Sequence, residues 1–204
     1  PNPGQGNLQP TPTKTMAELA STDYAGKLGS DTAPLIMIEY SDFQCPYCRR
    51  YDVATHGAIV DKYVKAGKLQ ILYKDFPLSF HPMATPYANA ARCAGEQEKF
   101  WEMHDKIFDE QQKIDPSGGT VTTVTADNIK QWAQDLGLDT AKFNTCFDAS
   151  KYQSSINATF AEGTANGVSG TPSFILGKRD AKGQLIVGAQ PTATFEAAID
   201  SLLN

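Results

Sequence analysis

The feature that most constrains this chain is the run Cys45-Pro46-Tyr47-Cys48, which separates an apolar segment from a segment of helical spacing. The apolar segment, residues 35–40, has the length and β-branched content of a buried strand. The helix is expected to end near Lys65, and a second apolar run, residues 69–76, predicts another strand. This order makes a βαβ unit, so the two strands are expected to pair in parallel through a right-handed crossover.

The position of the two cysteines relative to the helix predicts their chemistry. Pro46 suits the first helical position, because its φ is fixed and its missing N–H is not needed there. Cys45 then lies at the helix N-terminus, where unpaired N–H groups and the positive dipole end favour a thiolate. We predict that Cys45 is an exposed nucleophile and that Cys48, one turn on, resolves the mixed disulfide. Pro46 and Tyr47 are expected to set the loop geometry.

Two other interpretations of the C-x-x-C pair are weaker. A zinc site normally needs a second close pair of ligands, whereas Cys93 and Cys146 are far apart and the three histidines are isolated. A purely structural disulfide across so short a loop would restrain the unfolded chain little. A zinc-binding module remains an alternative, but we expect no metal, nucleotide or flavin, since the cysteine pair is itself the redox group.

The four cysteines also bear on location. Pairing Cys45 with Cys48 leaves Cys93 with Cys146, either as a long-range structural disulfide or as two buried thiols. A disulfide would fit an oxidising compartment, so an extracytoplasmic location is expected if this pair forms. No apolar run approaches the roughly 18 residues that span a bilayer. The chain begins at Pro1 and not at Met, so an export signal or membrane tether would lie upstream of it.

Composition and patterning predict one elaborated α/β domain. The chain has 204 residues, 41% hydrophobic content and a net charge of −5, which disfavours nucleic acid as a partner. We expect a mixed sheet flanked by helices, with a hairpin over residues 170–188 and a final helix over residues 192–203. The expected organisation is a flexible lead-in over residues 1–20, a core of residues 21–82 and 161–204, and an inserted helical subdomain over residues 83–160.

The combined motifs resemble one protein family. Residues 38–48, the triplet Gly170-Thr171-Pro172 and the segments 91–97 and 99–105 together are similar to the DsbA-like branch of the thioredoxin superfamily. The resemblance covers about residues 29–204 and implies a thioredoxin-like fold with a helical insertion. It also implies that Pro172 is a cis-proline facing the C-x-x-C loop. The backbone of Thr171 would then hydrogen-bond an extended substrate peptide.

Charged residues within the two apolar strands predict a further part of the site. Glu39 and Lys74 are lone charges inside these strands, and burying an unpaired charge is costly. We expect them to meet beneath the redox loop, with Glu39 relaying protons to or from Cys48 and Lys74 tuning its charge. Alternatively, both lean out to solvent at strand ends. His81 and His104 are expected to be ordinary surface or capped histidines.

These features together indicate a thiol–disulfide oxidoreductase that exchanges disulfides with cysteines of exported client proteins. The resemblance leaves its direction open, because Thr171 departs from the valine of the best-known oxidases and is similar to isomerases and reductases. The isomerases carry a sizeable N-terminal dimerisation domain, whereas this chain has a short lead-in. We favour a monomeric dithiol oxidase that a membrane redox partner recycles. A reductase or isomerase, or a non-catalytic peptide-binding chaperone, remains the alternative.

Overall fold

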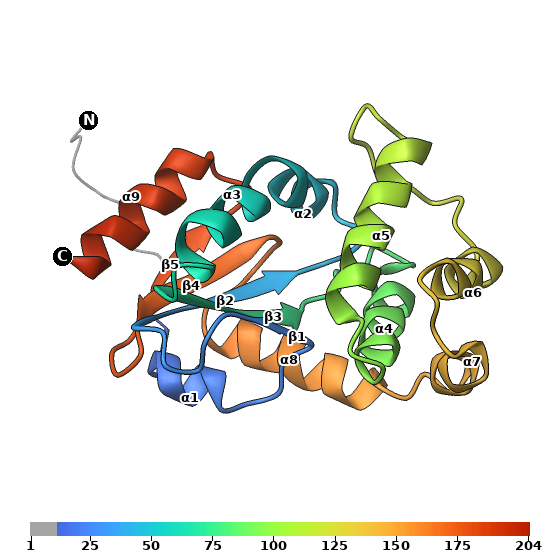
Figure 1. Cartoon of the computed structure of the whole chain (residues 1–204), viewed down its shortest axis with the longest axis horizontal. Coiled ribbons are helices and arrows are strands. Elements are labelled where there is room, and N and C mark those ends of the chain that lie inside the picture. Colours follow the sequence, from blue (N-terminus) through green and yellow to red (C-terminus); the bar gives the residue numbers. More distant parts are fainter. Residues whose placement is uncertain (1–11) are drawn as a thin grey trace.

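A five-stranded mixed sheet forms the centre of the computed structural model, which describes residues 12–204 (Figure 1). Across the sheet the strands are β1 (Gly26–Leu28), β3 (Leu69–Asp75), β2 (Leu35–Ser41), β4 (Ser173–Lys178) and β5 (Gln184–Val187). Only β2 and β3 pair in parallel, and the other neighbours are antiparallel. The predicted βαβ unit and the predicted hairpin are therefore confirmed, while β1 was not predicted.

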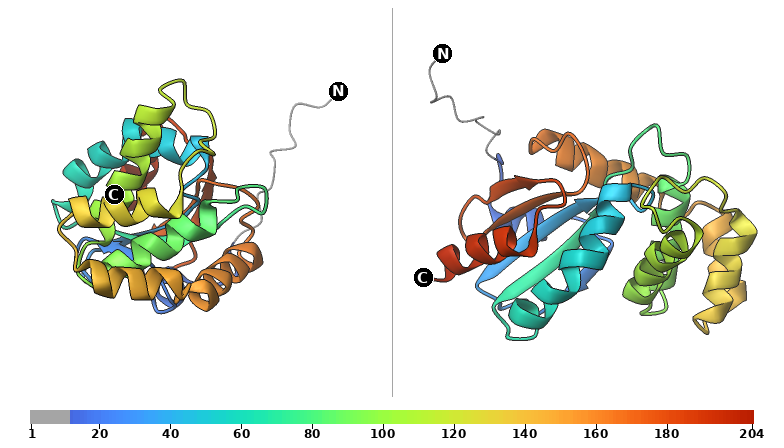
Figure 2. Two further views of the ribbon diagram at one scale, coloured as in Figure 1. Left: turned by 90° about the vertical axis from the view of Figure 1, so that its right-hand side faces the viewer. Right: turned by 90° about the horizontal axis from the view of Figure 1, so that it is seen from above.

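Helices cover both faces of the sheet, as Figures 1 and 2 show. One face carries α2 (Pro46–Tyr51), the π-helical turn η1 (Asp52–His56), α3 (Gly57–Ile59), a second π-helical turn η2 (Val60–Val64) and α9 (Thr192–Leu203). The other face carries α1 (Met16–Ala20) and α8 (Gln153–Ala165). Because side chains alternate along a strand, Leu35 and Met37 of β2 pack on the first face and Ile36 and Ile38 pack on the second.

The N-terminal segment is folded from at least Met16 onward. Thr15 caps α1 through reciprocal hydrogen bonds with Glu18, and Met16 and Leu19 of this helix are fully buried against the sheet. The prediction of a flexible lead-in that reaches residue 20 is therefore wrong for α1, because burial of its two apolar side chains offsets the entropy of ordering it. Residues 1–11 of the predicted lead-in lie outside the described residues.

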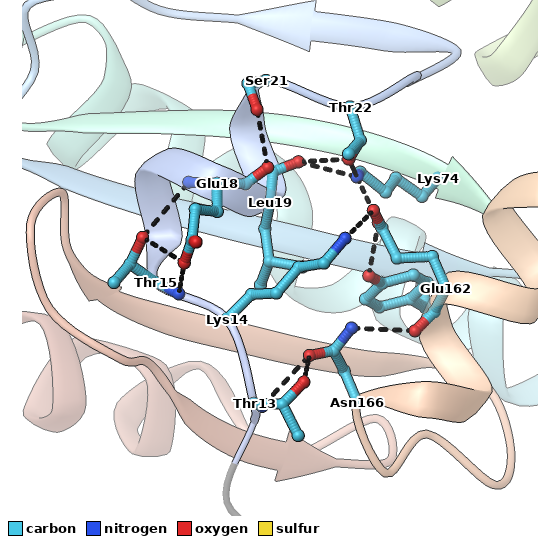
Figure 3. Close-up of polar contacts among 11 residues, drawn as sticks. Thr13, Lys14, Thr15, Glu18, Leu19, Ser21, Thr22, Lys74, Glu162 and Asn166 are labelled. Carbon is cyan, nitrogen blue, oxygen red and sulfur yellow. Dashed lines mark hydrogen bonds and ion pairs between the residues drawn. The ribbon is translucent and has the colours of Figure 1, made fainter.

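Lys74 of β3 connects α1 to α8 beneath the sheet (Figure 3). Its side chain is fully buried, and Nζ donates to the Leu19 carbonyl oxygen at 2.7 Å and to Thr22 Oγ1 at 2.6 Å. The same ammonium forms an ion pair with Glu162 of α8. Lys74 thus has a structural role, since a buried ammonium remains charged only where several acceptors replace water.

The helical insertion stands at one end of the sheet (Figures 1 and 2). It comprises α4 (Ala84–Gly95), α5 (Phe100–Ile114), α6 (Ala126–Asp135) and α7 (Thr140–Asp148). Thr125 and Asp139 cap α6 and α7, since the side-chain oxygen of each accepts backbone N–H groups in the first turn. The predicted C-terminal boundary of the insertion at residue 160 is wrong, because it falls inside α8, whose C-terminal half packs on the sheet. None of the described helices is both long and apolar enough to span a membrane.

Candidate active site

The redox loop joins the end of β2 to the start of α2. Cys45 is the N-cap residue of α2 and Pro46 is its first residue, as the sequence predicted. The Cys45 N–H donates to the Asp42 carbonyl oxygen at 3.0 Å, and the Cys45 carbonyl oxygen accepts from the Arg49 N–H at 3.1 Å. Both cysteines are free thiols. Tyr47 between them is 56% exposed.

A loop distant in sequence packs against the first cysteine. The Thr171–Pro172 peptide bond is cis, which confirms the configuration that the resemblance implied. Cys45 Sγ donates to the Thr171 carbonyl oxygen at 3.5 Å, so the two loops meet at this sulfur. Cys45 is consequently only 3% exposed, against 1% for Cys48, and the prediction of an exposed nucleophile is wrong.

The two thiols differ strongly in acidity. Hydrogen bonding to Cys48 lowers the pKa of Cys45 to about 6, against the opposing effect of burial. The Thr171 side chain and the backbone N–H groups of Cys48 and Tyr47 lower this pKa further. Burial raises the pKa of the Cys48 thiol well above its ordinary value, and the neighbouring Cys45 sulfur raises it too. The pair therefore presents one stabilised thiolate and one thiol that holds its proton.

Asp42 organises the loop from below. Its backbone N–H lies 3.4 Å from Cys48 Sγ, while its carboxylate accepts from the Gln44 N–H at 2.7 Å and the Leu78 N–H at 2.9 Å. His81 Nδ1 lies 2.8 Å from the same carboxylate. His81 is 7% exposed, so the expectation of a surface histidine is wrong, whereas the alternative of a capped histidine fits its contact with Asp42. Asp42 and His81 are 39 residues apart, and no sequence pattern connects them.

The helical insertion forms one wall of the site. Gln44 donates to the Val121 carbonyl oxygen at 2.7 Å, and Gln111 of α5 donates to the Phe43 carbonyl oxygen at 2.7 Å. Arg49 of α2 donates to the Gly119 carbonyl oxygen at 2.9 Å. An open cleft of about 540 Å³ lies between α2 and the tip of the insertion. Its lining includes Tyr47, Arg50, Val53 and Gly118.

Glu39 and Lys74 do not meet, so that prediction is wrong. In the parallel pairing of β2 with β3, Glu39 lies opposite Tyr73, whereas Lys74 lies opposite Tyr40. Paired residues share a face of the sheet and neighbours alternate, so Lys74 and Glu39 lie on opposite faces. Glu39 is 2% exposed, and burial raises its pKa to about 7. The basic side chain beside it is His56, whose Nδ1 lies 4.0 Å from Glu39 Oε2.

Cys93 and Cys146 form a disulfide between α4 and α7, with their Cα atoms 5.8 Å apart. The sequence allowed either a structural disulfide or two buried thiols at these positions, and the structure contains the disulfide. It lies within a large apolar cluster that also includes Cys45 and Cys48.

Comparison with known proteins gives the family. The family model described as Thioredoxin matches residues 21–201. The fold is similar to α-DsbA1 of Wolbachia pipientis, with a TM-score of 0.72 and 21% identity over 91% of this chain and 95% of that one. It is equally similar to oxidised BdbD of Bacillus subtilis, with a TM-score of 0.74 and 18% identity over 89% of this chain and 97% of that one.

Two kinds of curated relatives match the sequence. The Na(+)/H(+) antiporter NhaA 3 of Salinispora tropica is 30% identical over 86% of this chain, which spans 25% of the antiporter's length. The "Probable disulfide bond formation protein D" of Bacillus anthracis is 33% identical over 42% of this chain and 40% of that protein. The chain therefore spans well under half the length of these relatives. The family model and the architecture agree: the chain belongs to the thioredoxin family and has the DsbA-like thiol–disulfide oxidoreductase fold.

Proposed function

We propose that the chain is a dithiol oxidase that introduces disulfides into client proteins, with Cys45 and Cys48 as its redox couple and no other cofactor. The contrast in acidity between the two thiols carries this proposal. The pKa of Cys45 is lowered to about 6, which stabilises the reduced form as a thiolate. A stabilised reduced form makes the corresponding disulfide a stronger oxidant.

The reaction transfers two electrons from the client to the couple. A client thiolate attacks Cys45 Sγ of the Cys45–Cys48 disulfide, and Cys48 leaves as a thiolate that takes up a proton. A second client thiolate then attacks the client sulfur of the mixed disulfide, and Cys45 leaves as a stabilised thiolate. The client gains a disulfide and the couple becomes a dithiol, so a separate oxidant must remove two electrons and two protons before the next turnover.

Client binding is proposed at the junction of the two loops. The Thr171 backbone lies beside the Cys45 sulfur, where an extended client segment can pair with it as an added strand. Exposed apolar side chains at the rim, Tyr47 and Val53, favour clients that are still unfolded. The net charge of −5 disfavours nucleic acid as a partner. We expect the chain to act as a monomer, because a single chain supplies both cysteines and Thr171.

The proposed location is outside the cytoplasm, close to a membrane. The Cys93–Cys146 disulfide supports an oxidising compartment. Relatives named as antiporters and as a disulfide bond formation protein support proximity to the membrane and to a membrane redox partner that reoxidises the couple. A membrane-impermeant maleimide should label reduced Cys45 in intact cells. Labelling only after permeabilisation would place the chain in the cytoplasm.

Trapping of the mixed disulfide tests the proposed reaction. In a Cys48→Ala variant, Cys45 should form a lasting covalent complex with an unfolded client that has a single cysteine in a glutathione buffer, since neither Cys48 nor a second client thiol is present to release it. The Cys45→Ala variant is the matched control and should form no such complex. Equal yields of covalent complex from both variants would contradict the assigned roles, and so would no complex from either.

A further inference from the structure

The buried basic side chains of the described residues have carboxylate partners, with one exception. His104 of α5 is a typical case, because its Nδ1 lies 2.8 Å from Asp105 Oδ1 and 4.0 Å from Asp52 Oδ1. His104 is 1% exposed, so the expectation of a surface histidine is wrong, whereas the alternative of a capped histidine fits these contacts. A carboxylate also lies within 4.0 Å of each of four other buried basic side chains: His56, Lys74, His81 and Arg92.

Arg49 of α2 is the exception. It is 2% exposed, and its Nη2 donates to the Gly119 carbonyl oxygen at 2.9 Å. Its Nη1 is buried and has no hydrogen-bond partner, and the guanidinium forms no ion pair with any carboxylate of the described residues. Burial lowers the pKa of Arg49, although the charge of Asp115 opposes this effect. Because an arginine keeps its charge at physiological pH, a buried cation remains here without a paired anion.

The acidic side chain that acts on Arg49 is bound to its own loop. Asp115 follows α5, and its Oδ1 accepts from the Ser117 N–H at 3.0 Å while its Oδ2 accepts from the Gly119 N–H at 2.7 Å. These bonds hold the tip of the insertion, and with it the carbonyl oxygen that Arg49 contacts. Asp115 therefore positions the wall beside Arg49 and leaves the positive charge of Arg49 available to an anion from outside the chain.

Arg49 lines the cleft of about 540 Å³ between α2 and the loop that follows α5 (Figure 1). Among the described residues that line this cleft, the only charged ones are Arg49 and Arg50. Arg50 is exposed, and its guanidinium carbon lies 4.9 Å from the centre of the Tyr47 ring, a cation–π contact that holds it at the cleft. The cleft is therefore a basic surface on a chain whose net charge is −5.

The cleft begins beside the nucleophile. Its lining starts at Pro46, next to Cys45, and the Arg49 N–H donates to the Cys45 carbonyl oxygen at 3.1 Å. Arg49 thus lies one helical turn beyond Cys45, a rise of about 6 Å, which an extended chain covers in roughly two residues. Since the arginine side chains extend further, a client side chain about two to four residues from the client cysteine can reach them while that cysteine reacts with Cys45.

We propose that Arg49 and Arg50 bind a client carboxylate in this cleft, so that the chain prefers clients with Asp or Glu about two to four residues from the reactive cysteine. This inference rests on the proposed function, because it specifies which clients are oxidised. A carboxylate in the cleft lies against the exposed guanidinium of Arg50 and supplies the anion that the buried charge of Arg49 lacks. Because the chain is acidic overall, attraction for an acidic client is confined to this basic surface.

Competing peptides measure this preference. Each reduced peptide has two cysteines, and the peptides differ only in carrying Glu, Gln or Lys three residues outside each cysteine. Oxidised protein is mixed with a peptide at low ionic strength and quenched with acid, and mass spectrometry follows the transfer of the disulfide to the peptide, which leaves Cys45 and Cys48 as thiols. Each rate is divided by the rate of the same peptide with oxidised glutathione alone, because a nearby carboxylate also raises the pKa of the peptide thiol.

The wild type should oxidise the Glu peptide about tenfold faster than the Gln peptide, and the Lys peptide more slowly than either. Arg49→Gln and Arg50→Gln should each reduce the ratio of the Glu rate to the Gln rate to about threefold or less. This ratio does not change if a substitution only alters the reactivity of Cys45, since both peptides react with the same sulfur. Lys65→Gln, which removes one exposed positive charge far from the cleft, is the matched control and should keep the wild-type ratio.

The outcomes separate the carboxylate site from the proposed function. A wild-type ratio below about twofold, or a ratio that stays at the wild-type value in either arginine variant that folds, would overturn the site. Arg50 is exposed, so Arg50→Gln decides the question if Arg49→Gln fails to fold. Failure of the oxidised wild type to transfer its disulfide to any of the three peptides would instead overturn the proposed function.

Discussion

His81 Nδ1 lies 2.8 Å from Asp42 Oδ2, directly beneath the redox loop. The hydrogen bond to Asp42 raises the pKa of His81, burial opposes it, and the charge of Cys45 raises it further. Asp42 also receives the Cys45 N–H through its carbonyl oxygen at 3.0 Å. Asp42 therefore holds the redox loop in place, and the positive charge of His81 lies close enough to Cys45 to stabilise its thiolate.

The first prediction concerns the effect of the His81 charge on the pKa of Cys45. His81→Gln removes a positive charge near Cys45, so the pKa of Cys45 should rise by about 0.5 to 1 and the disulfide should become less oxidising. Thiolate absorbance near 240 nm during a pH titration measures this directly. The control is Lys65→Gln, an exposed change of charge at the far end of the helical segment that begins at Pro46. An unchanged titration curve in His81→Gln would show that the histidine serves only the structure.

The second prediction concerns stability. The pKa of Glu39 is about 7 in the folded chain against an ordinary value of 4.5, so the folded state resists its ionisation. The wild type should therefore lose up to about 3 kcal/mol as the pH rises from 4.5 to 7, whereas Glu39→Gln loses nothing from this group. Urea unfolding at pH 4 and pH 8 measures the difference. Parallel pH profiles for the two proteins would contradict the buried, protonated carboxyl.

The third prediction separates Lys74 from the chemistry. Lys74→Met leaves the Leu19 carbonyl oxygen without its cation and Glu162 with only the ion pair to Lys14, which should lower the free energy of unfolding by about 3 to 5 kcal/mol. A Lys74→Met/Glu162→Leu double variant should recover part of that loss. The pKa of Cys45 should stay at its wild-type value in both variants. A shifted thiolate titration in either one would restore a role for Lys74 in the redox site.

The fourth prediction concerns the disulfide of the insertion. Cys93 and Cys146 are 53 residues apart, so replacing both with alanine should lower the free energy of unfolding by about 4 kcal/mol. Formation of the Cys45–Cys48 disulfide with glutathione should proceed as in the wild type at temperatures where the variant is folded. Loss of this reactivity in a folded variant would mean that the insertion positions the redox loop through this bond.

The central elements could be predicted because their signals are local. Strands β2 and β3 are mainly apolar, as buried parallel strands are, and α9 begins and ends where the sequence placed it. Pro46 marks the start of α2 and so the position of Cys45. Helix α8 lacks such a local signal, because a glycine at position 163 interrupts its sequence. This glycine is required by tertiary packing, since Phe76 and Tyr40 approach the helix closely at that point.

The surroundings of the couple could not be predicted, because they depend on contacts between distant segments. Glu39 and Lys74 were expected to pair, but a shift of one residue in register places them on opposite faces. His81 and His104 reach the site from the loop before α4 and from α5, and neither lies in a local motif that would predict its partner. Only the tertiary arrangement of these segments identifies their partners.

The reduction potential of the Cys45–Cys48 couple tests the central claim most directly. The protein is equilibrated against glutathione redox buffers, and its thiols are alkylated and counted by mass spectrometry. The lowered pKa of Cys45 predicts a potential between about −120 and −180 mV, the range of proteins that oxidise their clients. A potential below about −220 mV would instead make the chain a reductase that depends on an electron donor, and would contradict the account given above.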